Sequence, residues 1–266
     1  NHDIFINLAC ISNDSSFELN ENLSTSINMD AFEPMIQIAK NKKIKKFIYA
    51  SSSSVYGVSD KPNVTEDHPL VPLTLYNKYK GMCEPILFKY TDDDFCGVVF
   101  RPATVCGYSP RMRLDLTVNI LTNHAYNNKV IKVFGGEQLR PNIHIKDYCN
   151  FVELLIRTDE KKINNQIYNV GSENMSVMEI AKIVKKNVEN YLNLNDEILI
   201  ETVPSNDNRS YHINSDKAFD HLGFKTKLSI NDAVFDICDA FSNNKIPNPT
   251  DSLEYYNVKK IKSLNI

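Results

Sequence analysis

The chain has 266 residues, of which 42% are hydrophobic and 24% are charged. This length and composition are those of an ordinary globular protein with one large or two small domains. A formal net charge of −3 gives no electrostatic reason to expect nucleic acid or an acidic membrane as a partner, and no apolar run approaches the roughly 20 residues of a membrane span. The six cysteines form no C-x-x-C pair and the histidines show no ligand spacing, so no metal site is predicted. No signal peptide is visible, and we expect a cytoplasmic protein.

The first predicted elements are a buried strand at residues 4–9 and a helix at residues 26–40, separated by a polar loop at 12–24. Pro34 lies inside the helix, so we expect either a kink or a first helical turn there. One apolar stripe is expected along the helix, formed by Ile27, Ala31, Met35 and Ile38.

A second buried strand is predicted at residues 47–49, Phe-Ile-Tyr, and four serines at 51–54 follow it directly. In open α/β sheets, ligands bind just beyond the carboxyl ends of the strands. The position of these hydroxyl groups therefore favours a role in chemistry over a role in packing.

Tyr76 and Lys80 open the next predicted helix, which runs to about residue 90. A spacing of four places both side chains on one helix face, about 5–6 Å apart at Cβ, where an ammonium group can favour the anionic form of a phenol. The same spacing recurs twice at residues 255–260, but no strand-end hydroxyl precedes those pairs. Only Tyr76 and Lys80 are therefore interpreted as a candidate base and its partner.

The run FIYASSSSVYG followed by YNKYK resembles the extended short-chain dehydrogenases/reductases of the nucleotide-sugar epimerase/dehydratase family. The resemblance implies that Ser52, five residues before Gly57, supplies the catalytic hydroxyl, that Tyr76 is the general base and that Lys80 is its partner. It also implies an α/β fold, with a Rossmann-like doubly wound parallel sheet and a smaller α/β substrate-binding domain. NAD is the implied cofactor, a nucleotide-diphosphate sugar the implied substrate, and a homodimer the implied assembly, formed through the 26–40 and Tyr76 helices.

The family begins with a strand and a glycine-rich phosphate loop, whereas none of the eight glycines here lies in a G-x-x-G-x-x-G motif. The strand at 4–9 is similar to the family's fourth strand, so we expect a fragment that lacks about the first 60 residues. The residue that separates NAD from NADP follows the family's second strand, so NAD depends on the resemblance alone. The cofactor-binding residues that the resemblance implies are Leu8, Ala9, Cys10, Asn28, Ala50, Ser51, Tyr76, Lys80, Arg101 and Pro102.

A third buried strand at 96–100 leads into R-P-A-T-V-C-G, similar to the family's R-P-x-N-V-Y-G with Thr104 in place of Asn. A helix is expected to open at residue 109 and to run to about 128, followed by a strand at 131–134 and a glycine turn. The substrate-binding residues that the resemblance implies are Ser53, Ser54, Thr104, Arg113, Arg140 and Arg209.

In the remaining chain, His144 and Asp147 are interpreted as ordering a helix at 148–156, and a strand is expected at 167–170. Ser176 and Glu179 form a capping box that begins a helix ending at about residue 191. Terminal helices are expected at 214–222 and 230–242, and a polar tail, 243–266, is expected to wrap the surface. We assign 1–108 to the remaining cofactor domain and 109–266 mainly to the substrate domain, with 140–172 returning to the first sheet.

The resemblance leaves more than one reaction open. Dehydratases of the family carry an acid and a base directly after the catalytic hydroxyl residue, where this chain has Ser53 and Ser54. A serine is a poor acid or base for such an elimination, so a 4-epimerase is favoured over a 4,6-dehydratase or a 4-ketoreductase. A non-catalytic family member or inactive fragment, with a binding or assembly role, is the alternative from another functional class.

Overall fold

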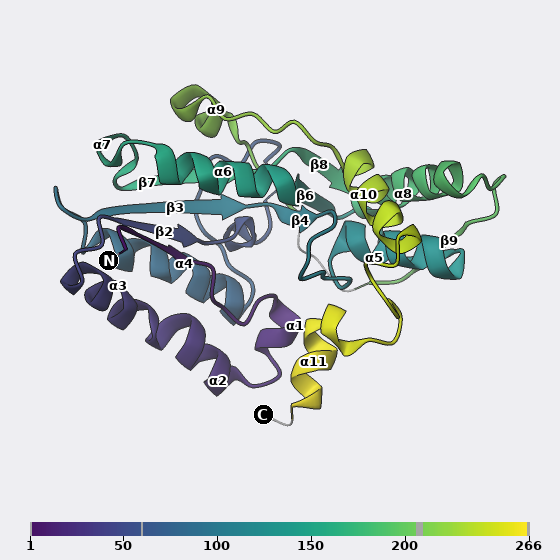
Figure 1. Ribbon diagram of the computed structural model, residues 1–266, viewed down its shortest axis with the longest axis horizontal. Helices are drawn as coiled ribbons and strands as arrows, with labels where there is room; N and C mark the ends of the chain where they lie inside the picture. The colour runs from purple at the N-terminus through teal and green to yellow at the C-terminus, as the bar shows by residue number, and fades with distance from the viewer. Residues whose placement is uncertain (1, 60, 206–209, 265–266) are drawn as a thin grey trace.

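The first sheet contains four parallel strands in the order β1-β2-β3-β7. A computed structural model describes residues 2–59, 61–205 and 210–264 of the chain. The strands are β1 (Ile4–Asn7), β2 (Lys46–Ala50), β3 (Cys96–Pro102) and β7 (Gln166–Val170), all close to their predicted positions. Because all four run in one direction, their carboxyl ends meet at the same edge of the sheet (Figure 1). The predicted α/β class is thereby confirmed.

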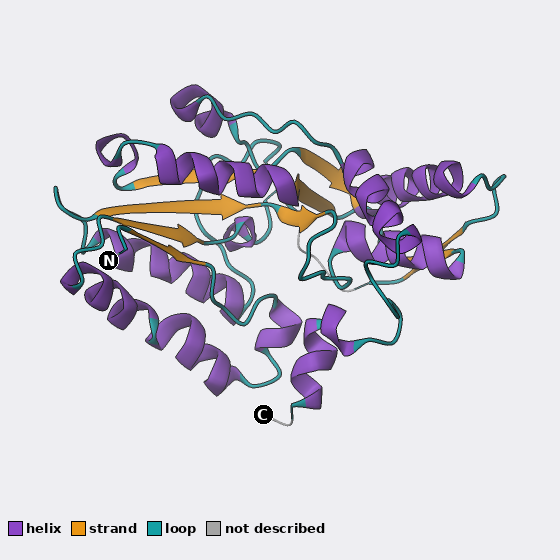
Figure 2. Ribbon diagram, viewed as in Figure 1, coloured by secondary structure: helices purple, strands orange, loops and turns teal. Residues whose placement is uncertain are grey.

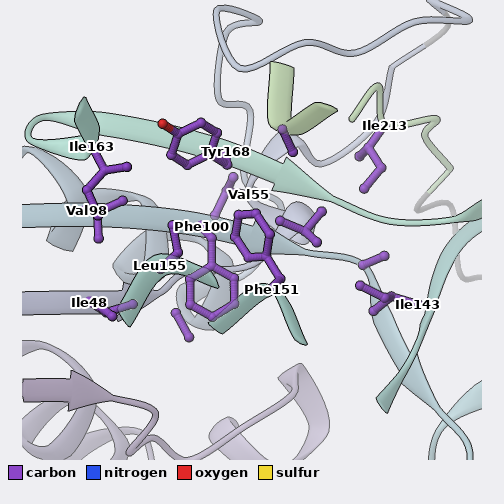
Figure 3. Packing of buried hydrophobic residues seen from close by; sticks show 14 of the residues in the cluster. Ile48, Val55, Val98, Phe100, Ile143, Phe151, Leu155, Ile163, Tyr168 and Ile213 are labelled. Carbon is purple, nitrogen blue, oxygen red and sulfur yellow. The ribbon is translucent and has the colours of Figure 1, made fainter. Parts of the chain in front are cut away.

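Helices cover both faces of this sheet, as Figure 2 shows. Side chains of β2 alternate between the two faces, with Phe47 and Tyr49 packed against α3 (Phe32–Asn41) and α4 (Leu75–Phe88). Ile48 of β2 points the other way, toward Phe100 of β3 and toward the helix α6 (Ile145–Arg157) (Figure 3). These continuous apolar runs are what a sheet buried on both faces requires.

The predicted helix at 26–40 consists of two pieces, a π-helical turn η1 (Ser26–Asp30) and α3, and it directly follows the short helix α2 (Glu21–Thr25). The predicted stripe is wrong, since Ile27 and Ile38 are exposed while Phe32, Ile36 and Ala39 are buried. An extra residue in a π turn rotates the following helix face by about 100°, which moves the buried stripe. Pro34 lies in the first turn of α3, where its missing N–H leaves no bond unmade.

The loop predicted at 12–24 contains two short helices, α1 (Asp14–Phe17) and α2. Asn13 and Asn20 cap them, and each is followed by an acidic residue in the first turn. Asparagine caps with acidic first turns stabilise a helix N-terminus. This segment therefore has regular structure where the sequence analysis expected a loop.

Two smaller sheets build the other half of the molecule. One has the order β4-β6-β8 and the other pairs β5 with β9. Within residues 140–172, β7 pairs with the first sheet, whereas β6 pairs with β4 and β8. The bounds of these strands are β4 (Thr104–Cys106), β5 (Val130–Phe134), β6 (Leu139–His144), β8 (Glu173–Ser176) and β9 (Leu199–Val203).

The helices α5 (Thr117–Asn123), α8 (Val177–Leu192) and α10 (Ile230–Ser242) share a buried apolar cluster with β5. The predicted capping box at Ser176 is confirmed. The predicted helix start at residue 109 is wrong, because the chain stays irregular until Thr117 and only then forms α5 and a π-helical turn, η3 (His124–Asn128). In the 109–116 segment Met112 and Leu114 are buried two residues apart, which is an alternation typical of an extended chain.

The C-terminal region contains more structure than the sequence analysis expected. After α7 (Glu160–Ile163) and α9 (Asp216–Leu222), the chain ends in a 3-10 turn, η4 (Leu253–Tyr255), and a helix, α11 (Asn257–Ser263). Figure 1 shows α11 beside α1, near the other end of the sequence. In the described part of the chain, no helix has both the length and the apolarity needed to cross a bilayer.

Candidate active site

A cavity of about 550 Å³ opens at the carboxyl edge of the first sheet. Its wall on the sheet side is formed by the residues that follow β1, β2 and β3 and by the first turns of α4. The predicted site residues that line the cavity are Leu8, Cys10, Ala50, Ser51, Ser52, Ser53, Ser54, Tyr76, Lys80, Pro102, Thr104, Arg113 and Arg140. The structure therefore brings the three predicted catalytic residues to one cavity.

The serines after β2 form a hydrogen-bonded turn at the cavity wall. Ser54 donates its hydroxyl proton to Asn77 Oδ1 of α4, and the Ser52 and Ser54 oxygens are 2.7 Å apart. Because the Ser54 proton is directed at Asn77, the proton in the contact between the two serines comes from Ser52. The Ser54 backbone N–H also donates to Ser52 Oγ, so the Ser52 side chain has a defined orientation.

Lys80 is buried and its ammonium donates to the carbonyl oxygen of Ala50 at 2.7 Å. It also lies 5.1 Å from the centre of the Tyr49 ring. Both contacts fix the lysine against the end of β2. Its positive charge makes the electrostatic potential of the cavity more positive there.

The backbone of Asn13 lies near the Tyr76 hydroxyl and acts to lower its pKa. Burial raises the pKa of Tyr76 far above its ordinary value, and nearby Cys10 and Asp14 raise it further. The largest charge effect that lowers this pKa comes from Arg113 and not from Lys80, which differs from the expectation based on spacing.

The backbone of Asn13 has φ 71° and ψ 158°, a conformation normally taken by glycine. Its side chain caps α1 by accepting from the Ser16 N–H, and its neighbour Asp14 accepts from the Thr74 hydroxyl. These bonds hold a strained backbone amide against the tyrosine.

Three predicted cofactor-binding residues do not line the cavity. Ala9 is exposed beside it. The Asn28 side chain is occupied by the backbone of Ile11, from which it accepts a bond at 2.8 Å and to which it donates one at 2.9 Å. The Arg101 guanidinium is buried behind the wall. The predicted substrate residue Arg209 lies outside the described residues.

Arg101 forms the centre of a buried polar network. Its guanidinium binds the Glu84 carboxylate through two bonds of 2.9 and 2.6 Å, and it donates to the Tyr56 hydroxyl at 2.7 Å. Glu84 also accepts from the Ser51 hydroxyl at 2.6 Å. Because Tyr76, Lys80 and Glu84 are spaced by four residues on α4, the network ties the helix that carries Tyr76 and Lys80 to the ends of β2 and β3.

The far side of the cavity consists of residues that the sequence analysis largely did not identify. Arg113 was predicted, and it donates to Asp115 at 2.8 Å and to Ser12 at 3.0 Å. Ser12, Arg111 and Asp115 also line the cavity. Arg111 and Arg113 could be noticed in the sequence because arginine is scarce in this chain. No sequence pattern marked Ser12 or Asp115.

His144 and Asp147 have the structural roles that the sequence analysis gave them. His144 Nδ1 accepts from the Lys146 N–H and so caps α6, while Asp147 accepts from the backbone N–H groups of Lys227 and Leu228. Across the described residues, no group of three or more His, Cys, Asp or Glu side chains is placed to hold a metal ion.

Residues 1–171 match the model of the NAD dependent epimerase/dehydratase family. The chain belongs to this family. A UDP-glucose 4-epimerase of Bacillus subtilis is 28% identical over 54% of this chain and 48% of its own length. A dTDP-D-glucose 4,6-dehydratase of Dictyostelium discoideum is 27% identical over 68% of this chain and 44% of its own length. Both activities of the family name thus occur among the relatives.

Among solved structures, a UDP-glucuronic acid 4-epimerase from Bacillus cereus, in complex with UDP-glucuronic acid and NAD, superposes with a TM-score of 0.79. It is 23% identical, and the match covers 91% of this chain and 76% of that one. This similarity confirms the Rossmann-type fold. The matches to the first curated relatives span between 39% and 49% of their lengths.

The predicted cofactor is confirmed at the level of the family, which is NAD-dependent. The residues of this chain fit the nicotinamide end of a dinucleotide. Leu8, Ala50 and Pro102 offer apolar contacts, while Ser51 and Lys80 supply polar groups at the same strand ends. Ligand cavities of this size with a few convergent polar groups are typical of cofactor sites.

Proposed function

We propose that the protein is an NAD-dependent nucleotide-sugar 4-epimerase that acts through transient oxidation to a 4-keto sugar. The observation that supports this most strongly is the meeting of Ser52, Tyr76 and Lys80 at one cavity, although they come from two separate segments. An alcohol, a phenol and an ammonium group beside a nicotinamide are the groups that oxidation of a sugar hydroxyl needs.

Tyr76 is the general base that takes the proton of the 4-hydroxyl. Burial keeps the phenol protonated in the free protein, so the positive charges of Arg113 and Lys80 must lower its pKa when substrate and cofactor are bound. Bound NAD would supply the acceptor for the hydride and return it to the opposite face of the ketone.

Ser52 holds the reacting oxygen. In the free protein its proton points to Ser54, so Ser52 must turn toward the 4-hydroxyl when the sugar binds. Such a donor to a developing oxyanion contributes about 2.7–4 kcal/mol to transition-state stabilisation.

The surroundings of Ser52 favour epimerisation over dehydration. Ser53 is buried and Ser54 is bonded to Asn77, so neither position offers the acid or base that elimination of the 6-hydroxyl needs. The cavity carboxylates Asp14 and Asp115 are both engaged with other side chains.

Arg113, Arg140 and Thr104 lie on the substrate side of the cavity. Arg113 keeps one buried nitrogen, Nη2, without a partner among the described residues. A buried guanidinium donor is stabilised by a phosphate, carboxylate or hydroxyl oxygen of a ligand, and the planar fork suits a diphosphate. We assign a nucleotide-diphosphate sugar to this side, with Arg209 as a further contact.

The decisive experiment uses the full-length protein with NAD and a panel of UDP-glucose, UDP-glucuronic acid and dTDP-glucose. NMR of the products should show inversion at C4 with no net change in cofactor absorbance at 340 nm. Tyr76→Phe should lower turnover by about 10²–10⁴-fold, the usual contribution of a general base.

Tyr79→Phe is the matched control, because Tyr79 lies on the same helix and packs on Phe17. Its turnover should stay within about twofold of wild type. A dehydrated product, a net formation of NADH or full activity in Tyr76→Phe would contradict the proposal. The homodimer, the cytoplasmic location and the domain boundary at residue 108 stay predictions.

A further inference from the structure

Asn257, the first residue of α11, joins two segments of the cavity wall that are far apart in the sequence. Its side-chain amide donates to Ser12 Oγ at 3.0 Å, and its backbone N–H donates to Asp115 Oδ2 at 2.9 Å. Arg111 donates to its side-chain oxygen at 3.0 Å. All of the polar atoms that Asn257 can offer on this side are thus directed to residues that line the cavity.

These contacts close into a ring around Arg113. The guanidinium donates through Nε to Asp115 Oδ1 and through Nη1 to Ser12, the same two residues that Asn257 binds. With two of its three nitrogens used in this way, the fork is left with the buried Nη2 as its open donor. The orientation of that donor is therefore set by Asn257 through Ser12 and Asp115.

The position of Asn257 is itself fixed by apolar packing. Tyr256 is buried with Met112, Leu114 and Ile246 in one cluster, and its hydroxyl accepts from Asn123 at 3.0 Å. The Leu114 N–H donates to the carbonyl of Tyr255 at 2.9 Å. The turn before α11 is thus part of the folded core, and Asn257 is not on a loose tail.

We propose that Asn257 is a positioning residue for substrate binding, which orients Arg113 toward an oxygen of the bound nucleotide-diphosphate sugar. The identity of the bound molecule rests on the proposed function. The ring also borders the catalytic side, because Ser12 directly precedes Asn13, whose backbone lies near the Tyr76 hydroxyl.

The test is a double-mutant cycle in the full-length protein, with the UDP-sugar that the panel identifies. Asn257→Ala should raise KM about tenfold, the effect of one charge-assisted hydrogen bond, and change kcat by less than about twofold. In an Arg113→Ala background, Asn257→Ala should produce no further rise in KM. Lys262→Ala, on the exposed face of α11, is the control and should match wild type.

An equal rise in KM with and without Arg113 would overturn the proposal, because Asn257 would then act through the fold alone. An unchanged KM in Asn257→Ala would also overturn it. If the wild type turns over no nucleotide sugar, the proposed function fails separately. Amide hydrogen exchange of residues 109–117 then tests the ring directly, since Asn257→Ala should accelerate it relative to Lys262→Ala, and equal exchange would refute the ring.

Discussion

The two walls of the cavity are held in different ways. Behind the wall formed by β2, β3 and α4 lies a dry ion pair, with the Glu84 and Arg101 side chains only 3% and 4% exposed. In the opposite wall, Arg113 and Asp115 form an ion pair whose side chains are 19% and 15% exposed. Water can replace partners in the second wall but not in the first.

The difference between the two walls matches the different roles proposed for their residues. The groups proposed to perform proton transfer lie on the wall that cannot rearrange without leaving a charge buried and unpaired. The groups proposed to contact the nucleotide sugar lie on the wall whose hydrogen bonds can exchange with a ligand. The comparison predicts that equivalent substitutions should be far more costly to stability on the first wall.

The largest effect on stability is expected for Glu84→Gln. Removal of the carboxylate leaves the buried Arg101 cation without its partner, which should lower the free energy of unfolding by about 3–5 kcal/mol. Urea denaturation measures this. The double variant Glu84→Met with Arg101→Met should regain most of the loss, because neither charge remains. Additive losses in the double variant would contradict the assignment.

A second test of the buried wall uses pH. Burial raises the pKa of Tyr56 to about 12, although Arg101 opposes the shift. Between about pH 10 and 12 the unfolded chain loses this proton while the folded protein keeps it, so the free energy of unfolding should fall by about 1.4 kcal/mol per pH unit from this group. Urea denaturation from pH 9 to 12 should show that the free energy of unfolding declines less steeply with pH in Tyr56→Phe than in wild type. Identical slopes would show that Tyr56 does not contribute to this pH dependence.

The smallest effect is expected on the opposite wall. Asp115→Asn removes a charge from a partly hydrated pair, and water can solvate Arg113 in its place, so stability should fall by about 1 kcal/mol or less. The same urea experiment measures it. A loss as large as that of Glu84→Gln would show that the two walls do not differ.

The sequence predicted which segments meet at the first wall, but it did not predict the Glu84–Arg101 pair behind that wall, since Arg101 was expected to bind the cofactor. Strands such as β2 and β3 are continuous apolar runs, and parallel strands place the residues after them at one edge, so Ser52 and the Tyr76 helix could be assigned to one site. The capping box at Ser176 was equally readable because it is a local pattern.

Apart from Arg113 and Arg140, the residues of the second wall could not be predicted, because this wall depends on contacts between distant segments. Nothing in the local sequence indicates that Asn257 would lie against Ser12, 245 residues away. The segment 109–116 was predicted as a helix, yet Met112 and Leu114 pack against the C-terminal Ile246 and Tyr256, and this burial overrides helical propensity. The π-helical turn η1 likewise left no signal in the apolar periodicity.

The backbone of Asn13 has a consequence for engineering. A non-glycine residue in this conformation costs on the order of 1–3 kcal/mol, and here the strained backbone lies beside the Tyr76 hydroxyl. Directed evolution for heat resistance alone would find a gain at this position by relaxing the loop. Such variants would have a higher melting temperature, but the hydroxyl of Tyr76, the proposed general base, would lose its defined position. Screens of this protein should therefore measure turnover together with melting temperature.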